Sequence, residues 1–132
     1  MKRALTYLIL FAALSLTASA QLSLTTATIA ESASLSSGVN LRDSVVVGII
    51  MPSSWTTADI TLQASYDGTT YYDVYNMDGD EYTITASASR IIVLSPLEIQ
   101  WARYIKIRSG TASTPVTQSA ARSINLISRS VQ

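Results

Sequence analysis

Acidic side chains gather in one short stretch of the chain. Asp73, Asp78, Asp80 and Glu81 place four carboxylates within nine residues, and oxygen ligands of this kind could bind calcium. The spacing is not that of an EF-hand, and Gly79 between the acids suits a turn with solvated carboxylates. We interpret the cluster as a turn, with a calcium site as the alternative. Nothing in the sequence indicates that two of these acids face each other across a cleft, so glycoside hydrolysis is not predicted.

Histidine and cysteine are absent from the whole chain. Their absence excludes thiolate zinc sites, cysteine nucleophiles and the commonest general base. A Ser-His-Asp triad is excluded too, and the serine-rich stretch 32–37 has no histidine to activate it. We therefore predict no catalytic residue, no cofactor and a protein that is not an enzyme.

Tyrosines are the second group that could make a site. Tyr71, Tyr75 and Tyr104 occupy positions expected to face outward, where their rings could anchor a protein partner or stack on a sugar. Tyrosines that simply cover the surface of a sheet occupy the same kind of position, and both interpretations stay open. Trp55 is assigned to the core, whereas Tyr72 and Tyr82 are interpreted as covering the surface of a sheet without a binding role.

Basic residues form a modest cluster on the late strands, at Arg103, Lys106, Arg108 and Arg122. We expect surface ion pairs from this cluster, with Arg103 at the rim of the core beside a carboxylate partner. Nine Lys and Arg balance nine Asp and Glu, so nucleic-acid binding by a basic field is not predicted. Charged residues make up only 14% of the chain, and Ser, Thr, Gln and Asn must cover much of the surface.

The N-terminal residues have the pattern of a secretion leader. A basic start at 1–3 precedes an apolar, uncharged run at 4–17, and residues 18–20 read Ala-Ser-Ala, the small-x-small pattern of a cleavage site. The apolar run is shorter than the roughly 20 residues of a membrane-spanning helix, so no permanent membrane anchor is expected. We divide the chain into a leader, 1–20, and a single domain, 21–132.

Two runs in the domain are apolar on both faces of a strand. Residues 45–51 read VVVGIIM and predict a central strand buried on both sides. Gly48 within this run suggests a bulge or a close approach by another segment. Residues 90–95, RIIVLS, form the second such run.

The stretch 60–66 alternates without exception. Ile60, Leu62, Ala64 and Tyr66 share the face that we expect to turn inward, and the residues between them are polar. Asp67-Gly68 then predicts a hairpin turn. Further strands are predicted at 22–29, 71–76, 82–86, 102–109 and 122–130, with one helical turn at 97–100. These elements predict an all-β, single-domain, jelly-roll-like β-sandwich of eight or nine strands.

Two family resemblances follow from particular segments. ITLQASYDG at 60–68, RII at 90–92 and RYIKI at 103–107 are similar to discoidin-type, galactose-binding-like jelly rolls. This resemblance implies a sandwich fold and, more weakly, sugar binding. A secreted or periplasmic module that binds a cell-surface glycan is therefore one functional expectation.

A more extensive resemblance is to small virion-associated proteins of tailed bacteriophages. It is carried by GIIMPSSWTTADITLQASYDG at 48–68 and RYIKIRSGTASTPVTQSAAR at 103–122. The resemblance implies an accessory structural protein of the head or tail, in contact with other virion proteins and forming homo-oligomers. The leader departs from that pattern, because phages assemble in the cytoplasm. Either the true start lies near Gln21, or this chain has an exported role.

Overall fold

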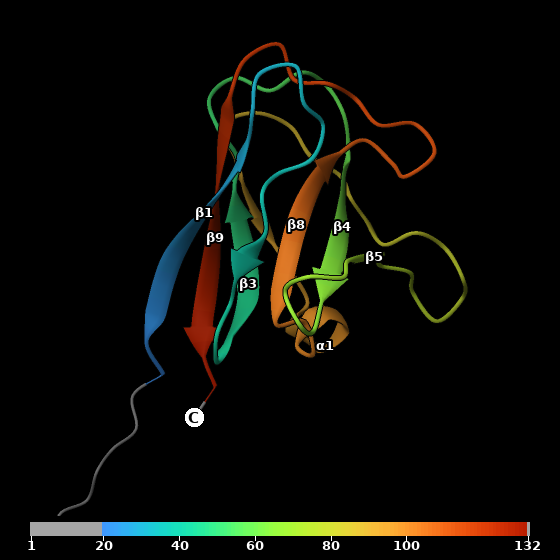
Figure 1. Ribbon diagram of the computed structural model, residues 1–132. Coiled ribbons are helices and arrows are strands. Elements are labelled where there is room, and N and C mark those ends of the chain that lie inside the picture. Colours follow the sequence, from blue (N-terminus) through green and yellow to red (C-terminus); the bar gives the residue numbers. More distant parts are fainter. Residues whose placement is uncertain (1–19, 132) are drawn as a thin grey trace, which may run out of the picture.

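The computed structural model describes residues 20–131 of the chain. Its elements are β1 Leu22–Ile29, β2 Val39–Asn40, β3 Ser44–Ile50, β4 Ile60–Ser65, β5 Tyr72–Asp73, β6 Thr83–Ile84, β7 Ile91–Val93, α1 Pro96–Ile99, β8 Tyr104–Ser109 and β9 Arg122–Ser130. The strands form a four-stranded sheet, β1-β9-β3-β7, and a five-stranded sheet, β2-β8-β4-β5, in which β6 also pairs with β4 (Figure 1). All strand pairs are antiparallel.

The two sheets pack around one core and confirm the prediction of an all-β sandwich with nine strands. The predicted helical turn is present as α1, which Pro96 begins at a position where proline is well tolerated. Within residues 20–131, no helix is long and apolar enough to cross a membrane. The predicted leader lies, apart from Ala20, outside the described residues.

The core is built from the alternating residues of each strand. Ile60 and Leu62 on β4, and Ile105 and Ile107 on β8, are at most 1% exposed. Burying a side chain of this size contributes about 2 kcal/mol, so the alternation fixes which face of each strand turns inward. The residues of the four-stranded sheet that complete this core include Ile29, Ile49, Ile124 and Leu126.

β3 lies inside the four-stranded sheet, as its apolar sequence predicts, but it is not fully buried on both sides, because Val47 and Ile50 are half-buried. The register of its pairing with β9 shifts between Val46 and Gly48, which confirms the predicted bulge. A side chain at Gly48 would come within 3.2 Å of the carbonyl oxygen of Ile92 and 3.4 Å of Cδ1 of Ile127. The predicted close approach is therefore confirmed as well.

Tyr66, which the alternation places on the inward face of its strand, is exposed. Tyr66 is 78% exposed, and Tyr72, predicted to cover the surface of a sheet, is 70% exposed. β4 ends at Ser65, so the turn that follows carries Tyr66 away from the inward face. Tyr72 lies opposite Ala64 in an edge strand of only two residues, where little of the sandwich covers its ring. Trp55, by contrast, is partly buried against the core, as predicted, and Tyr82 is partly buried there as well.

β7 is also less buried than its sequence suggests. It is an edge strand that pairs only with β3. Ile92 packs against the core, whereas Ile91 and Val93 are 63% and 85% exposed. Nothing in the described part of the chain covers the outer face of this edge, so an apolar run alone does not ensure burial on both faces.

Candidate functional site

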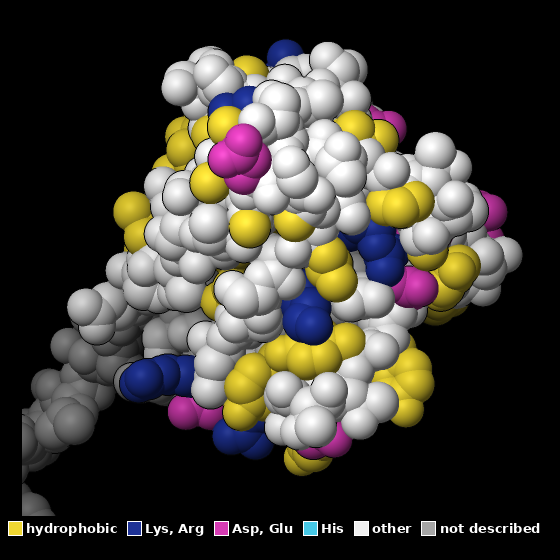
Figure 2. All heavy atoms as spheres, turned by 45° about the horizontal axis from the view of Figure 1, so that its top comes forward, with side chains coloured by type: hydrophobic (Ala, Val, Ile, Leu, Met, Phe, Trp, Pro, Cys, Tyr) yellow, Lys and Arg dark blue, Asp and Glu magenta, His cyan; other side chains and the backbone are white. Residues whose placement is uncertain are grey.

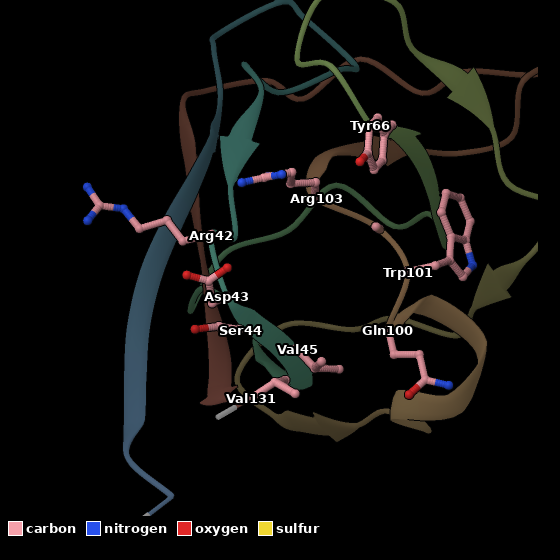
Figure 3. A pocket seen from close by; sticks show the side chains of 10 residues that line it. Arg42, Asp43, Ser44, Val45, Tyr66, Gln100, Trp101, Arg103 and Val131 are labelled. Carbon is pink, nitrogen blue, oxygen red and sulfur yellow. The ribbon is translucent and has the colours of Figure 1, made fainter.

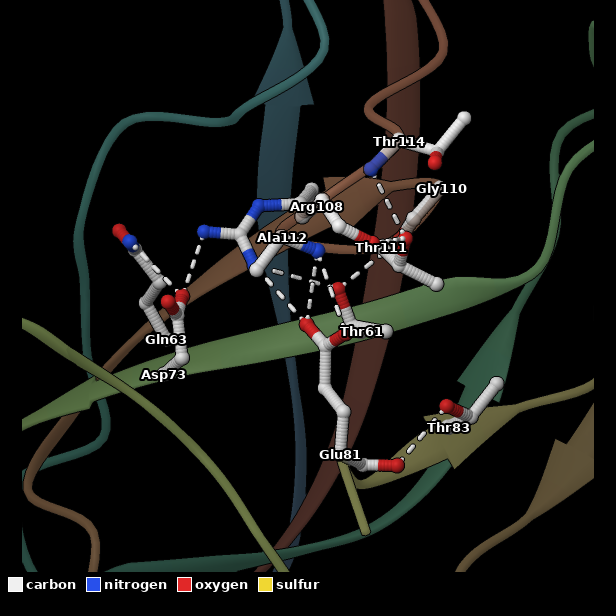
Figure 4. A network of polar contacts seen from close by, with 11 residues as sticks. Thr61, Gln63, Asp73, Glu81, Thr83, Arg108, Gly110, Thr111, Ala112 and Thr114 are labelled. Atoms are coloured by element: carbon white, nitrogen blue, oxygen red, sulfur yellow. Dashed lines mark hydrogen bonds and ion pairs between the residues drawn. The ribbon is translucent and has the colours of Figure 1, made fainter.

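Arg108 is buried, although the alternation of β8 places it on the outward face. Its guanidinium contacts two of the predicted acids: Nη2 lies 2.5 Å from Oδ1 of Asp73, and Nη1 lies 3.1 Å from Oε1 of Glu81 (Figure 4). Thr61 is the register partner of Arg108 on β4, and its hydroxyl donates to the Gly110 carbonyl at 2.8 Å. This polar network covers the outward face of β4 and β8.

Asp73 and Glu81 tie the network to the surrounding loops. Gln63 Nε2 donates to Asp73 at 3.1 Å, and the Ala112 N–H donates to the two Glu81 carboxylate oxygens at 2.9 and 3.2 Å. Burial acts to raise the pKa of Asp73, but hydrogen bonds from Arg108 and Gln63 and the charge of Arg108 hold it below its usual value. Asp73 is therefore an ionised partner of Arg108.

The other two acids of the predicted cluster are exposed and lie in a turn. Oδ1 of Asn76 accepts the backbone N–H of Asp78 at 3.0 Å and that of Asp80 at 2.9 Å. Gly79 has a φ of +88°, which favours glycine. Across residues 20–131, no group of three or more acidic residues is placed to hold a metal ion. The four acids are thus divided between an ion-pair network and a turn.

The three predicted contact tyrosines differ in exposure. Tyr71 is half-buried, with its hydroxyl where a side chain on Gly38 would lie, and Lys106 Nζ is 4.2 Å from the centre of its ring. Burial, followed by the neighbouring Tyr104 and Asp67, raises the pKa of Tyr71. Tyr104 is half-buried too, whereas Tyr75 is 56% exposed. A contact surface made of these three residues stays a prediction.

The Asp67-Gly68 turn forms where the sequence predicts it. Oδ1 of Asp67 accepts the backbone N–H of Thr70 and of Thr69 at 2.8 Å each, and the Ser65 hydroxyl at 2.9 Å. These three hydrogen bonds lower the pKa of Asp67 to about 2. Gly68 has a φ of +77°, and the ring of Tyr104 lies against it.

An open hollow of about 330 Å³ lies where the segment before β3 meets the segment before β8. Tyr66 and Trp101 lie on one side of it and Asp43 on the other, and Arg103 extends between them (Figure 3). Trp101 is 57% exposed. Aromatic rings beside a carboxylate and a guanidinium are groups that can bind a sugar.

Arg103 does not have the carboxylate partner that the sequence predicts. Its side chain is exposed and makes no ion pair with any residue between 20 and 131. Arg103 lies just before β8 begins, so the alternation that places Ile105 and Ile107 inward does not apply to it. Sequence reasoning also missed the hollow, because its lining comes from four separate segments: 42–45, Tyr66, 100–103 and Val131.

The four-stranded sheet has an apolar outer face. Leu22 and Leu24 on β1 are each 64% exposed, and Ile91 and Val93 extend the same face on β7. Ile127 on β9 and Ile50 on β3 lie between these edges and are half-buried. We call this set of six residues the apolar outer face: Leu22, Leu24, Ile50, Ile91, Val93 and Ile127.

The described surface is otherwise largely uncharged. On the face shown in Figure 2, acidic and basic side chains are few among white and yellow surface, as expected of a chain with 14% charged residues. The groups assembled on this face are mainly apolar, aromatic and hydrogen-bonding groups. Comparison of the chain with protein-family models, with curated proteins and with solved structures finds no match.

Proposed function

We propose that this protein is a non-enzymatic interaction module, an accessory structural protein on the head or tail of a tailed phage particle. The apolar outer face of the four-stranded sheet is the observation that carries the proposal. In a sandwich, residues on the outer face of a sheet usually alternate as polar positions. The largest exposed apolar patch on a protein is often functional, and extended patches mark surfaces that bind other proteins.

The virion context of the proposal comes from the two segments that resemble phage proteins. Both have structural roles in this fold that suit a scaffold. Residues 48–68 comprise the end of β3, the loop with Trp55, β4 and the Asp67 turn, whereas residues 103–122 comprise β8, the loop that contacts Glu81 and the start of β9. The localisation proposed for the protein is accordingly the virion.

The absence of histidine and cysteine supports a role without catalysis. The partly buried acids Asp73 and Glu81 are ion-paired with Arg108. Despite its burial, the pKa of Asp73 is held below its usual value by hydrogen bonds from Arg108 and Gln63 and by the charge of Arg108, so Asp73 is a weak base. The buried polar cluster therefore supports the fold.

Purified phage particles give the direct test. Mass spectrometry of particles from the phage that encodes this chain should detect it in a constant ratio to the major head or tail protein through successive purification steps. A chain that is lost during gradient purification, or never detected, contradicts the proposal. The N-terminal peptide in the same data would show whether the chain begins at Met1 or near Gln21.

A secreted or periplasmic carbohydrate-binding module is the second candidate, and the hollow beside Tyr66 and Trp101 favours it. Replacing Trp101 by alanine should lower glycan binding about tenfold or more, since stacking of an aromatic ring on a sugar is lost. A glycan array probed with the wild-type chain, Trp101→Ala and Tyr75→Ala tests this. No binding by the wild-type chain, or equal binding by Trp101→Ala, argues against the hollow.

A further inference from the structure

We infer that the apolar outer face packs against the same face of a second copy of this chain, in a two-fold symmetric dimer. This inference rests on the proposed interaction function and names its partner. Three kinds of observation support it: the register of the strands, the charge of the face and its area.

The strand register aligns apolar residues in a row across the sheet. Leu24 on β1 lies opposite Ile127 on β9, Ile127 opposite Gly48 on β3, and Gly48 opposite Val93 on β7. Directly opposite residues of an antiparallel pair point to the same face. Leu24 and Val93 are 64% and 85% exposed, so the row ends in two uncovered apolar side chains, one at each edge of the sheet.

The outer face carries little charge. Arg129 on β9, opposite Leu22, is the one charged residue at the paired positions that share the face with the row, as far as the described strands show. In a two-fold symmetric contact the same face of both copies meets, so a face with many charges of one sign would repel its partner. A face built from Leu, Ile, Val, Thr, Ser and Asn avoids that repulsion.

The area of the face approaches the size that a dimer needs. Four strands about 4.8 Å apart, of eight, nine, seven and three residues, present roughly 440 Å² before the relief of the side chains is counted. A standard interface buries about 800 Å² on each partner. The four most exposed side chains of the face, Leu22 and Leu24 at one edge and Ile91 and Val93 at the other, together expose roughly 500 Å², within the range of about 300–600 Å² for the largest apolar patch on a typical monomer.

A two-fold axis can align the rows of two copies. The row has side chains at Leu24, Ile127 and Val93, and the Gly48 position is covered by Cδ1 of Ile127 in the same chain, 3.4 Å from where a side chain would begin. A two-fold axis parallel to the strands, between β9 and β3, reverses the order of the row. Ile127 of one copy then lies over Gly48 of the other, and Leu24 of one copy lies over Val93 of the other. Two sheets can approach to about 10 Å in this way.

The oligomeric state provides the first test. Analytical ultracentrifugation of the wild-type chain should show a dimer, and Leu24→Lys and Val93→Lys should each raise the dimer dissociation constant about 100-fold, because each buries a lysine in both halves of the contact. Met77→Lys is the control, since Met77 is fully exposed on the turn before Asp78, and it should leave the dimer unchanged. A monomeric wild-type chain at about 100 µM, or a dimer that both face variants leave intact, overturns the inference.

Cysteine cross-linking tests the position of the two-fold axis. The chain has no native cysteine, so only the introduced thiols can react. A mixture of Leu24→Cys and Val93→Cys chains should be joined by a thiol-reactive cross-linker that spans about 8 Å, because two sheets about 10 Å apart hold the thiols too far from each other for a direct disulfide. Either variant alone should cross-link at least about tenfold less. Equal cross-linking by Leu24→Cys alone overturns the geometry. If the wild-type chain is monomeric but is still found in purified particles, the second-copy inference fails and the proposed function stands.

Discussion

Replacing Arg108 by alanine is expected to lower the free energy of unfolding by about 3 kcal/mol. The guanidinium is 9% exposed, and its removal leaves Glu81, 14% exposed, and Asp73, 29% exposed, without their charge partner. Breaking a buried ion pair by removing one member typically costs about 3–5 kcal/mol, and the partial exposure of Asp73 brings the expected cost to the lower end. Equilibrium urea unfolding of the two chains measures the difference.

Arg103→Ala is the matched control for this change. Arg103 is exposed just before the same strand and makes no ion pair within the described residues. Its replacement should change the free energy of unfolding by no more than about 0.5 kcal/mol. Equal losses in the two variants would show that the Arg108 network does not stabilise the fold.

Hydrogen exchange would locate the effect of the Arg108 change. Glu81 accepts the Ala112 N–H, and Arg108 holds Glu81 and Asp73 on either side of the 74–80 hairpin. Without Arg108, exchange at Ala112 and Val74 should accelerate more than exchange at Leu126 in the core. Uniform acceleration at all three amides would indicate a global loss of stability without a local role for the network.

Replacing Gly110 by alanine is the second change with a large expected effect, about 3 kcal/mol or more. Gly110 has a φ of +85°, and a side chain there would collide with the carbonyl oxygen of Thr114 and lie 2.8 Å from the Val116 nitrogen. The backbone cannot easily move, because the Gly110 N–H donates to the Asp59 carbonyl at 2.8 Å and its own carbonyl accepts the Thr61 hydroxyl at 2.8 Å. Thermal and urea unfolding measure the loss.

Gly79→Ala separates the two causes of that loss. Gly79 has nearly the same backbone conformation, with a φ of +88°, but nothing lies within 4 Å of the position of an added side chain. Its replacement should therefore cost only the conformational term, about 1 kcal/mol. The collision with backbone atoms should account for a further 1–3 kcal/mol or so at Gly110. Similar losses at both glycines would contradict this account.

Much of the fold follows from local patterns. The alternation at Ile60, Leu62 and Ala64 predicts the inward face of β4, because side chains in a strand repeat every two residues and these three therefore share one face. Gly48 in an apolar run predicts a bulge, and Asp67-Gly68 predicts a turn. Each of these signals lies within a few neighbouring residues, and each is confirmed.

Local patterns fail to predict the exposure of a side chain where contacts with distant segments determine it. Tyr66 follows the alternation in sequence but lies beyond the end of β4. Gln118 lies in a stretch that reads as a polar loop, yet it is fully buried, and it donates to the Ser109 hydroxyl at 2.7 Å and accepts the Thr56 N–H at 2.9 Å. Its burial depends on partners that are up to 62 residues away in the chain.

The sequence by itself determined that this chain is an all-β sandwich without histidine or cysteine chemistry, because periodicity and composition are local properties. Tertiary structure alone decided that Arg108 is buried and ion-paired with Asp73 and Glu81. From the sequence, Arg108 belongs to the outward face of a strand and the two acids to an acidic turn. Tertiary structure also decided that Leu24, Ile127 and Val93 align in one row, since strand order and register bring them together from opposite ends of the chain. Pairing between distant strands depends on the whole hydrophobic core, which no single segment specifies.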